Sequence, residues 1–500
     1  MVQDLIKSKE ELEEIAHFLL DGIPKSSLDI VSRYMRATYD RVSFINGKKQ
    51  SQTGSPTTVN QEEMGGIYTL TSIDDLFSHN RREILVARNL EPYQDFKLAQ
   101  KGIKLPEEQI VVFTDIPTGI ERYDQELAEF SKRHPNTRLS RTLTVEQRVI
   151  VNSQGGIFIQ SIPFVGITYS HGYHPLTTSR DIAAVCTSEE DVKRLIELIA
   201  FLPDPTLDKS IKKSDSFSEA FHRLHSISAL QYPSLEEAGI SPANLYDVVV
   251  LTGTPVHEVF GHHFEEPIHF LGYNETPTFK HGQVIENEDL ILMDNPHLTI
   301  ADFKPVGFTI TDAYGRRRPA RIHIKDGRCM EFLGSEYGDP SKLNKYLNLG
   351  DTGENIHVGN AGQGIDGHFP QPRMSCTILD GKTEQIDLEG KIVVVSNEGH
   401  TSPQDKTYAL GAAECYVIKD GKPMKVPPLR ITGGVYQALA NMRLLDDWTY
   451  NVGNCGKPAP QTRGMATVAV SEFTRSQVWE KQQVLPLPLP DSYLAALLGK

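Results

Sequence analysis

Residues 248–267 read VVVLTGTPVHEVFGHHFEEP, a run of valines that leads through a turn into a cluster of histidines and a glutamate. The valine run is typical of a buried strand, and the loop after such a strand often carries catalytic groups. His257 and Glu258 are adjacent, and His262 follows five residues after His257. In the common His-Glu-x-x-His motif the histidines are four residues apart, so both imidazoles project from one face of a helix. Here the second histidine comes one residue later.

This extra residue sets a geometric condition on any metal site. Five residues along an ideal α-helix rotate the second imidazole by about 140° from the first, so the pair cannot bind one ion. A single π-type turn restores a common face, and such turns favour functional sites. Gly261, just before His262, makes the distortion easier because it lacks a Cβ. A metal site here therefore requires a deformed helix; without one, the histidines face solvent or are hydrogen-bonded in the core.

A catalytic zinc site needs three protein ligands, an open position for water and a carboxylate that takes the proton of that water. Glu258 is adjacent to the first histidine, as this chemistry requires. Three residues are candidates for the third ligand, and spacing alone does not choose among them. They are Glu286, Glu288 and Cys455, the last of which lies between glycines in a loop-like stretch.

The composition limits the class of protein. A length of 500 residues predicts two or more domains, and 39% hydrophobic with 23% charged residues is typical of a soluble globular chain. The net charge of −14 argues against a nucleic-acid-binding surface. We find no apolar run long enough for a transmembrane helix and no signal peptide at the N-terminus. The five scattered cysteines do not resemble a disulfide framework, so we expect a cytoplasmic protein.

The pattern along the chain predicts an α+β fold. We expect a mixed helix and hairpin N-terminal domain over residues 1–225, a β-rich C-terminal domain over 226–475, and a C-terminal tail over 476–500. Helices are expected over 3–21, 26–39, 74–101, 125–134 and 188–202. Hairpin turns are expected at 46/47, 155/156, 326/327, 380/381 and 420/421, where Asn-Gly, Gly-Gly and Asp-Gly pairs occur.

Several segments in the C-terminal half resemble the TldD/PmbA metallopeptidases. YDVVVLTGTPVHEVFGHHFEE is similar to the strand and His-Glu-x-x-x-His motif of that family, with its longer spacing. FTITDAYGRRRPARIHIKDGRCMEFL, GHFPQPRMSCTIL and NVGNCGKPAPQTRG resemble its later segments in the same order. The resemblance implies that His257, His262 and Cys455 bind zinc and that Glu258 is the general base. It also implies the branch that retains the motif, as opposed to the metal-free branch that pairs with it.

The expected activity is hydrolysis of peptide bonds in unstructured peptides or proteins. We predict that Arg373 and His263 contact the substrate, and that the protein forms a homodimer or a heterodimer with a TldD/PmbA homologue. The alternative is a non-catalytic, zinc-stabilised subunit that binds peptides or a partner, for which His263 offers a fourth ligand. A hydrolase of non-peptide amides is a third possibility, because the same ligands serve it.

Overall fold

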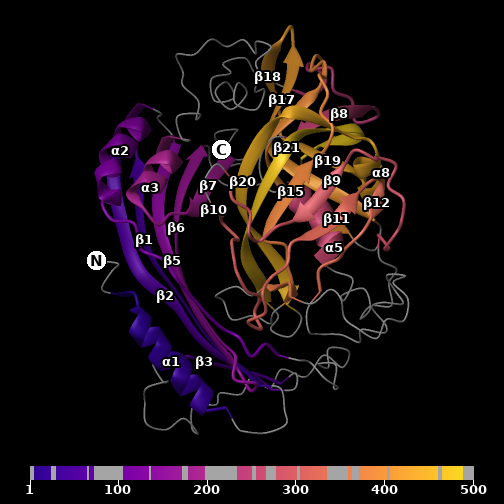
Figure 1. Cartoon of the computed structure of the whole chain (residues 1–500). Coiled ribbons are helices and arrows are strands. Elements are labelled where there is room, and N and C mark those ends of the chain that lie inside the picture. Colours follow the sequence, from indigo (N-terminus) through magenta and orange to yellow (C-terminus); the bar gives the residue numbers. More distant parts are fainter. Residues whose placement is uncertain are drawn as a thin grey trace.

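Two large sheets, one formed mainly by each half of the chain, make up most of the structure (Figure 1). The structure is a computed structural model, and it describes the following residues: 5–23, 30–64, 67–72, 105–133, 137–171, 178–197, 234–250, 255–265, 278–300, 304–334, 359–362, 371–402, 406–459 and 464–487. Helices accompany strands in both halves, which confirms the predicted α+β class.

The N-terminal sheet contains eight strands in the described part of the chain, in the order β10-β7-β6-β5-β1-β2-β3, with β4 paired to β6. Apart from the parallel β4–β6 pair, its neighbours are antiparallel. The strands are β1 (Ile30–Ile45), β2 (Lys48–Met64), β3 (Ile67–Ser72), β4 (Gln109–Phe113), β5 (Thr137–Asn152), β6 (Ile157–His171), β7 (Thr178–Val185) and β10 (Lys304–Pro305).

Helices cover the outer face of this sheet (Figure 1). They are α1 (Lys9–Asp21), the 3-10 turn η3 (Ile120–Tyr123), α2 (Asp124–Arg133) and α3 (Glu189–Glu197). Helix α1 begins with a capping box between Ser8 and Glu11, and it packs Leu12, Ile15 and Leu19 onto the strands. Helix α3 begins with a reciprocal pair of bonds, in which the Ser188 N–H donates to Asp191 Oδ2 and the Asp191 N–H donates to Ser188 Oγ.

The helix predicted over 26–39 is wrong, because residues 30–39 belong to the long strand β1. This strand pairs with β2 on one side and β5 on the other. Both of its faces are buried, with Tyr34 on the side of α1 and Val31 on the opposite side. A strand buried on both faces loses the alternation of polar and apolar residues that identifies a strand in sequence. The predicted helix over 74–101 lies outside the described residues.

The C-terminal sheet contains eleven strands in the described part, in the order β12-β11-β9-β15-β21-β19-β17-β16-β8, with β18 on β17 and β20 on β21. Strand β21 also pairs with β8, so β8, β16, β17, β19 and β21 close into a ring. The strands are β8 (Leu245–Val250), β9 (Ile291–Asp294), β11 (Arg321–Lys325), β12 (Arg328–Cys329), β15 (Cys376–Asp380), β16 (Ile392–Ser402), β17 (Thr407–Lys419), β18 (Lys422–Val426), β19 (Leu429–Gly434), β20 (Met442–Ala459) and β21 (Gly464–Pro486). A separate pair joins β13 (Ala361–Gly362) to β14 (Gln371–Pro372), and α8 (Val435–Ala440) follows β19.

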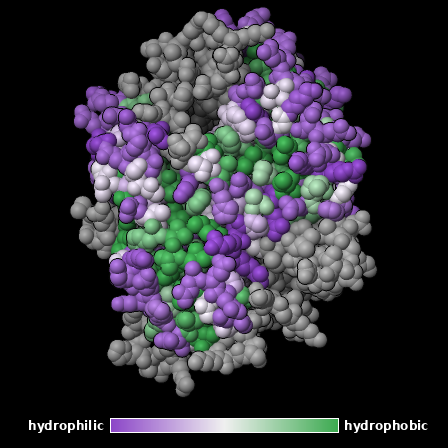
Figure 2. Space-filling view, in the orientation of Figure 1, coloured by the Kyte–Doolittle hydropathy of each residue, from purple (hydrophilic) through white to green (hydrophobic). Residues whose placement is uncertain are grey.

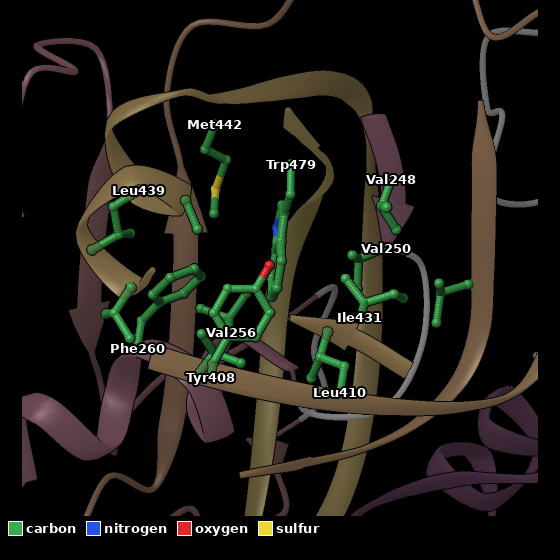
Figure 3. Packing of buried hydrophobic residues seen from close by; sticks show 14 of the residues in the cluster. Val248, Val250, Val256, Phe260, Tyr408, Leu410, Ile431, Leu439, Met442 and Trp479 are labelled. Carbon is green, nitrogen blue, oxygen red and sulfur yellow. The ribbon is translucent and has the colours of Figure 1, made fainter. Parts of the chain in front are cut away.

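Trp479 of β21 lies in the middle of the C-terminal core (Figure 3). Its ring is fully buried, and its centroid lies 5.3 Å from that of Tyr408 and 5.2 Å from that of Phe260. Val248 and Val250 of β8 point toward the same interior. Because Phe260 lies in the His-Glu segment, this core also supports the chain that carries the predicted site.

Asn46–Gly47, Asp326–Gly327 and Asp420–Gly421 form the predicted hairpin turns, with positive φ at both residues of each pair. The hairpin predicted at Asp380–Gly381 is wrong. There β15 ends, and its partners are β9 and, in parallel, β21. A Cβ on Gly381 would lie 2.4 Å from the carbonyl oxygen of Asp289, so this glycine permits a close backbone approach.

Parts of the C-terminal half contact the N-terminal sheet. Strand β10 pairs with β7, and the Tyr450 hydroxyl donates to the carbonyl oxygen of Ala183 at 2.5 Å. Arg33 donates to the carbonyl oxygen of Ala313 and lies over the ring of Tyr314. The two sheets therefore share a packed junction. The predicted boundary at 225/226 lies outside the described residues and stays a prediction.

The tail predicted to begin at residue 476 needs a correction, because β21 continues to Pro486. Residues 477–479 and 482–483 pair with β8, and Val478 and Trp479 are buried there. The first proline of the predicted tail is Pro486, where the strand ends. Residues 488–500 lie outside the described part.

Among the coloured residues of Figure 2, hydrophilic ones lie mostly toward the margins, and hydrophobic ones gather near the middle of that face. None of the helices in the described part is both long and apolar enough to cross a bilayer.

Candidate metal centre

The His-Glu segment forms the π-helical turn that its spacing requires. This turn, η6, spans His257–Gly261 and continues into the short helix α5 (His262–Glu265). The His262 N–H donates to the carbonyl oxygen of His257, five residues earlier. The predicted π-type distortion is therefore confirmed, and it brings the two imidazoles to one side, with ring centroids 5.0 Å apart.

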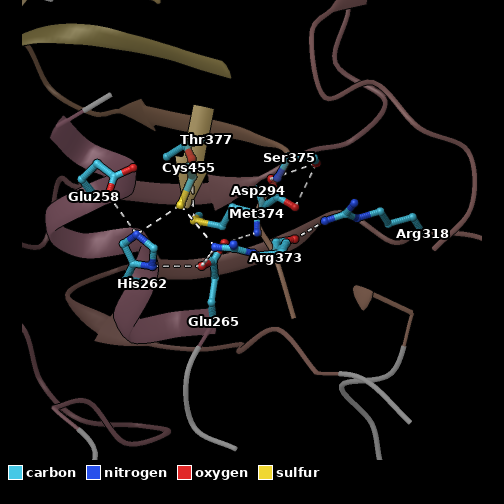
Figure 4. A network of polar contacts seen from close by, with 10 residues as sticks. All are labelled: Glu258, His262, Glu265, Asp294, Arg318, Arg373, Met374, Ser375, Thr377 and Cys455. Atoms are coloured by element: carbon cyan, nitrogen blue, oxygen red, sulfur yellow. Dashed lines mark hydrogen bonds and ion pairs between the residues drawn. The ribbon is translucent and has the colours of Figure 1, made fainter. Parts of the chain in front are cut away.

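Four side chains meet at this turn, each offering one donor atom, and these atoms lie within 4.8 Å of one another. They come from His257, Glu258, His262 and Cys455. The His262 Nε2 atom lies 3.0 Å from Glu258 Oε2 and 3.4 Å from Cys455 Sγ (Figure 4). Two imidazoles, a thiol and a carboxylate form a donor set of intermediate softness, which suits a divalent transition metal.

Cys455 reaches the cluster from β20, where it pairs with Val468 of β21. Burial opposes ionisation of its thiol, but the neighbouring His257 and His262 outweigh this and lower the pKa of Cys455 to about 6. The Arg373 Nη1 atom donates to the same sulfur at 3.2 Å. Thiolate character is what a metal ligand needs, because the thiolate and not the thiol coordinates metals.

His257 is fully buried, and within the described part of the chain its ring makes no hydrogen bond to an oxygen or nitrogen atom. Its backbone N–H donates to Glu472 Oε1 at 2.5 Å. Burial raises the pKa of Glu472 to about 8, although its bond to His257 works in the opposite direction. Burying imidazole nitrogens without hydrogen-bond partners costs free energy unless an ion or a proton binds there. These residues therefore fit a metal.

Glu258 is partly exposed, unlike the other three members of the cluster. Burial raises the pKa of its carboxyl, but the neighbouring His262 outweighs this and keeps the pKa below its usual value. A carboxylate that is ionised, partly accessible and beside the donors can accept a proton from a water molecule in the cluster.

The other predicted residues lie in different places. The side chain of Arg373 is buried and directed at Cys455 and Glu265, so it contacts the cluster rather than an open surface. His263 is buried against Phe279, with ring centroids 5.8 Å apart, and it is not a member of the donor group. Glu286 and Glu288 are exposed and do not belong to that group either.

Two residues of the site are absent from the sequence-based prediction. Glu265 lies three residues after His262, and its Oε2 lies 3.2 Å from His262 Nδ1. That spacing on a helix is a signal that sequence analysis can find. Glu472 lies 215 positions from its partner His257, and only the fold brings the two together.

Gly261 is a position where a side chain does not fit. A Cβ there would lie 2.4 Å from Met374 Sδ and 3.5 Å from His257 Nδ1. We expect Gly261→Ala to destabilise the protein by about 1–3 kcal/mol in urea unfolding, because Met374 is buried and must move. The double variant with Met374→Ala should lose less than the sum of the two single variants. Additive losses would contradict this contact.

The fold and the donor cluster together define an α+β protein with a candidate metal centre in its C-terminal half. Residues 249–474 match the family model of the PmbA/TldA metallopeptidase C-terminal domain. No curated protein matches the sequence. The matched residues belong to the TldD/PmbA family, as the sequence resemblance indicated.

Solved structures share the fold over nearly the whole chain. TldE from Thermococcus kodakarensis is 13% identical, with a TM-score of 0.57, covering 95% of this chain and 99% of its own. A candidate modulator of DNA gyrase from Thermotoga maritima is 14% identical, with a TM-score of 0.58, covering 96% and 100%. A further candidate modulator of DNA gyrase, from Bacteroides thetaiotaomicron, is 14% identical, with a TM-score of 0.54, covering 96% and 100%.

Proposed function

We propose that the protein is a zinc-dependent peptidase of the TldD-like branch, which hydrolyses peptide bonds in unstructured peptides or proteins. The observation that carries the proposal is the meeting of His257, Glu258, His262 and Cys455 at one π-turn. The family model, which is that of a metallopeptidase, supports the same class of reaction.

In this proposal His257, His262 and Cys455 hold the ion. Imidazole nitrogens and thiolates both bind catalytic zinc, and three protein ligands leave one position for water. Zinc, when bound, supplies the Lewis acidity that activates water and polarises a carbonyl. The thiolate of Cys455 is held in place by Arg373, to which we assign a role at the ligand in place of a substrate contact.

Glu258 is the general base of the proposed reaction. Its carboxylate accepts the proton of the attacking water and delivers it to the leaving amine. Its partial exposure and its distance of 3.0 Å from His262 Nε2 favour this role, because the base must reach both the donors and the substrate.

The substrate, the assembly and the compartment of the proposed peptidase are those expected from the sequence. The substrate is an unstructured peptide, the assembly is a homodimer or a heterodimer with a TldD/PmbA homologue, and the protein works in the cytoplasm. All five cysteines are free and buried, which favours a reducing compartment.

The test is zinc content and cleavage of the purified protein. We expect about one zinc per chain and cleavage of an unstructured peptide mixture, both lost on chelation and restored by added zinc. Cys455→Ser should lose zinc, whereas Cys415→Ser, which changes a buried thiol bonded to the Ala412 carbonyl, should keep it. Full zinc content in Cys455→Ser refutes the third ligand. No cleavage by the zinc-loaded protein, even with a co-purified partner, refutes the peptidase.

A second function is a zinc-stabilised subunit that binds peptides or a partner without cutting. One observation favours it: Glu258 lies within the group of four donors, so it can occupy the fourth position in place of water. Loss of zinc in Glu258→Gln, together with no cleavage by the wild type, supports this function over the peptidase.

A further inference from the structure

Glu265 is a fully buried carboxylate that contacts three parts of the site (Figure 4). Its Oε2 atom lies 3.2 Å from His262 Nδ1. Its Oε1 atom accepts the backbone N–H of Met374. The guanidinium of Arg373 lies 3.8 Å from Oε2 and also contacts the sulfur of Cys455. One side chain therefore connects a histidine donor with the segment that contacts the thiol donor.

We propose that Glu265 is a positioning residue that fixes the orientation of His262 directly and that of Cys455 through Arg373. The inference rests on the proposed function, because it assigns what holds two of the three proposed zinc ligands. It adds a residue outside the ligand set whose contribution is to arrange the donors before an ion binds.

The contact with His262 determines which imidazole nitrogen is available. A carboxylate 3.2 Å from Nδ1 favours the proton on that nitrogen when an ion binds, which leaves the lone pair of Nε2, on the side of Cys455 and Glu258, for the ion. Carboxylates that hold ligating histidines in this way orient the ring and raise its basicity.

The contact with Arg373 balances charge in a buried place. Arg373 is 1% exposed and Glu265 is 0% exposed, so each needs the other to offset the cost of burial. The guanidinium is then fixed for its bond to Cys455 Sγ. The backbone of the same segment has a separate support, since Asp294 accepts the N–H groups of Ser375 and Cys376. Changes at Glu265 should therefore leave this segment folded.

Glu265→Gln and Glu265→Ala distinguish a role in positioning His262 from a role in packing alone. In Glu265→Gln the amide oxygen can still accept the hydrogen bond from the Met374 N–H. The amide NH₂ then faces His262 Nδ1. That NH₂ donates to Nδ1, so the proton of the ring moves to Nε2, the nitrogen that must bind the ion. Glu265→Ala leaves a cavity but imposes no wrong tautomer. Positioning predicts that glutamine impairs zinc binding at least as much as alanine, while alanine costs more stability.

The experiment measures zinc affinity by competition with a chelating dye and stability by urea unfolding, for the full-length protein. We expect Glu265→Gln to weaken zinc binding by about 10–100-fold. The control is Glu414→Gln, a buried carboxylate bonded to the Tyr416 hydroxyl and outside the donor group, which should bind zinc like the wild type.

Each outcome decides the inference. Wild-type affinity in Glu265→Gln overturns it, and so does an alanine variant that binds zinc much more weakly than the glutamine variant. Both results leave the proposed function standing, because the wild type still binds zinc. A wild type that binds no zinc overturns the proposed function and, with it, this inference.

Discussion

Glu258→Gln is expected to lower the rate of peptide cleavage by about 10²–10⁴-fold while zinc content stays at the wild-type level. Glutamine keeps the shape of the side chain but cannot accept a proton from water. The three ligands of the proposed site, His257, His262 and Cys455, are unchanged. The loss should appear in kcat more than in KM, because the proton transfer belongs to the reaction step.

The matched control is Glu286→Gln, since Glu286 is an exposed acid outside the donor group. It should cleave peptides like the wild type. Cleavage by Glu258→Gln at the wild-type rate excludes Glu258 as the base. Loss of zinc from that variant identifies Glu258 as a ligand and favours the non-catalytic function.

Trp479→Ala is expected to destabilise the protein by about 3–5 kcal/mol. Trp479 fills the centre of the C-terminal core between Tyr408 and Phe260, and its indole N–H donates to Gln477 Oε1. Alanine leaves a cavity inside the ring of strands that β21 closes against β8. Because Phe260 belongs to the π-turn, the variant should also bind zinc more weakly than the wild type.

The other tryptophan of the chain is the control. Trp448 stacks on Phe473 with centroids 4.2 Å apart but is only partly buried. Trp448→Ala should therefore cost less, and urea unfolding followed by circular dichroism compares the two. Equal losses would mean that the core around Trp479 relaxes to fill the space.

The local features of the site follow from the sequence for identifiable reasons. Five residues between His257 and His262 permit a common face only with a π-turn, and Gly261 allows the close packing against Met374 that accompanies it. Asn-Gly and Asp-Gly pairs predict hairpins because their residues tolerate positive φ. The failure at Asp380–Gly381 has the same origin, since glycine also serves a close backbone approach.

The two elements that were predicted wrongly, the first part of β1 and the end of β21, depend on contacts between residues far apart in the chain. Residues 30–39 of strand β1 were predicted as part of a helix because pairing on both edges and burial of both faces are not visible in a local pattern. The continuation of β21 past residue 475 depends in the same way on its pairing with β8.

The sequence by itself determined the chemistry available here: two histidines, a glutamate and a glycine at one turn, in an order that fits a metal only with one distortion. Tertiary structure decided which distant groups join them. Strand β20 brings Cys455 to the two histidines, whereas Glu286 and Glu288 lie at the surface. The fold also places the carboxylate of Glu472 beside His257. Spacing along a helix fixes angles within a few turns, but only strand pairing fixes the distance between residues about two hundred positions apart.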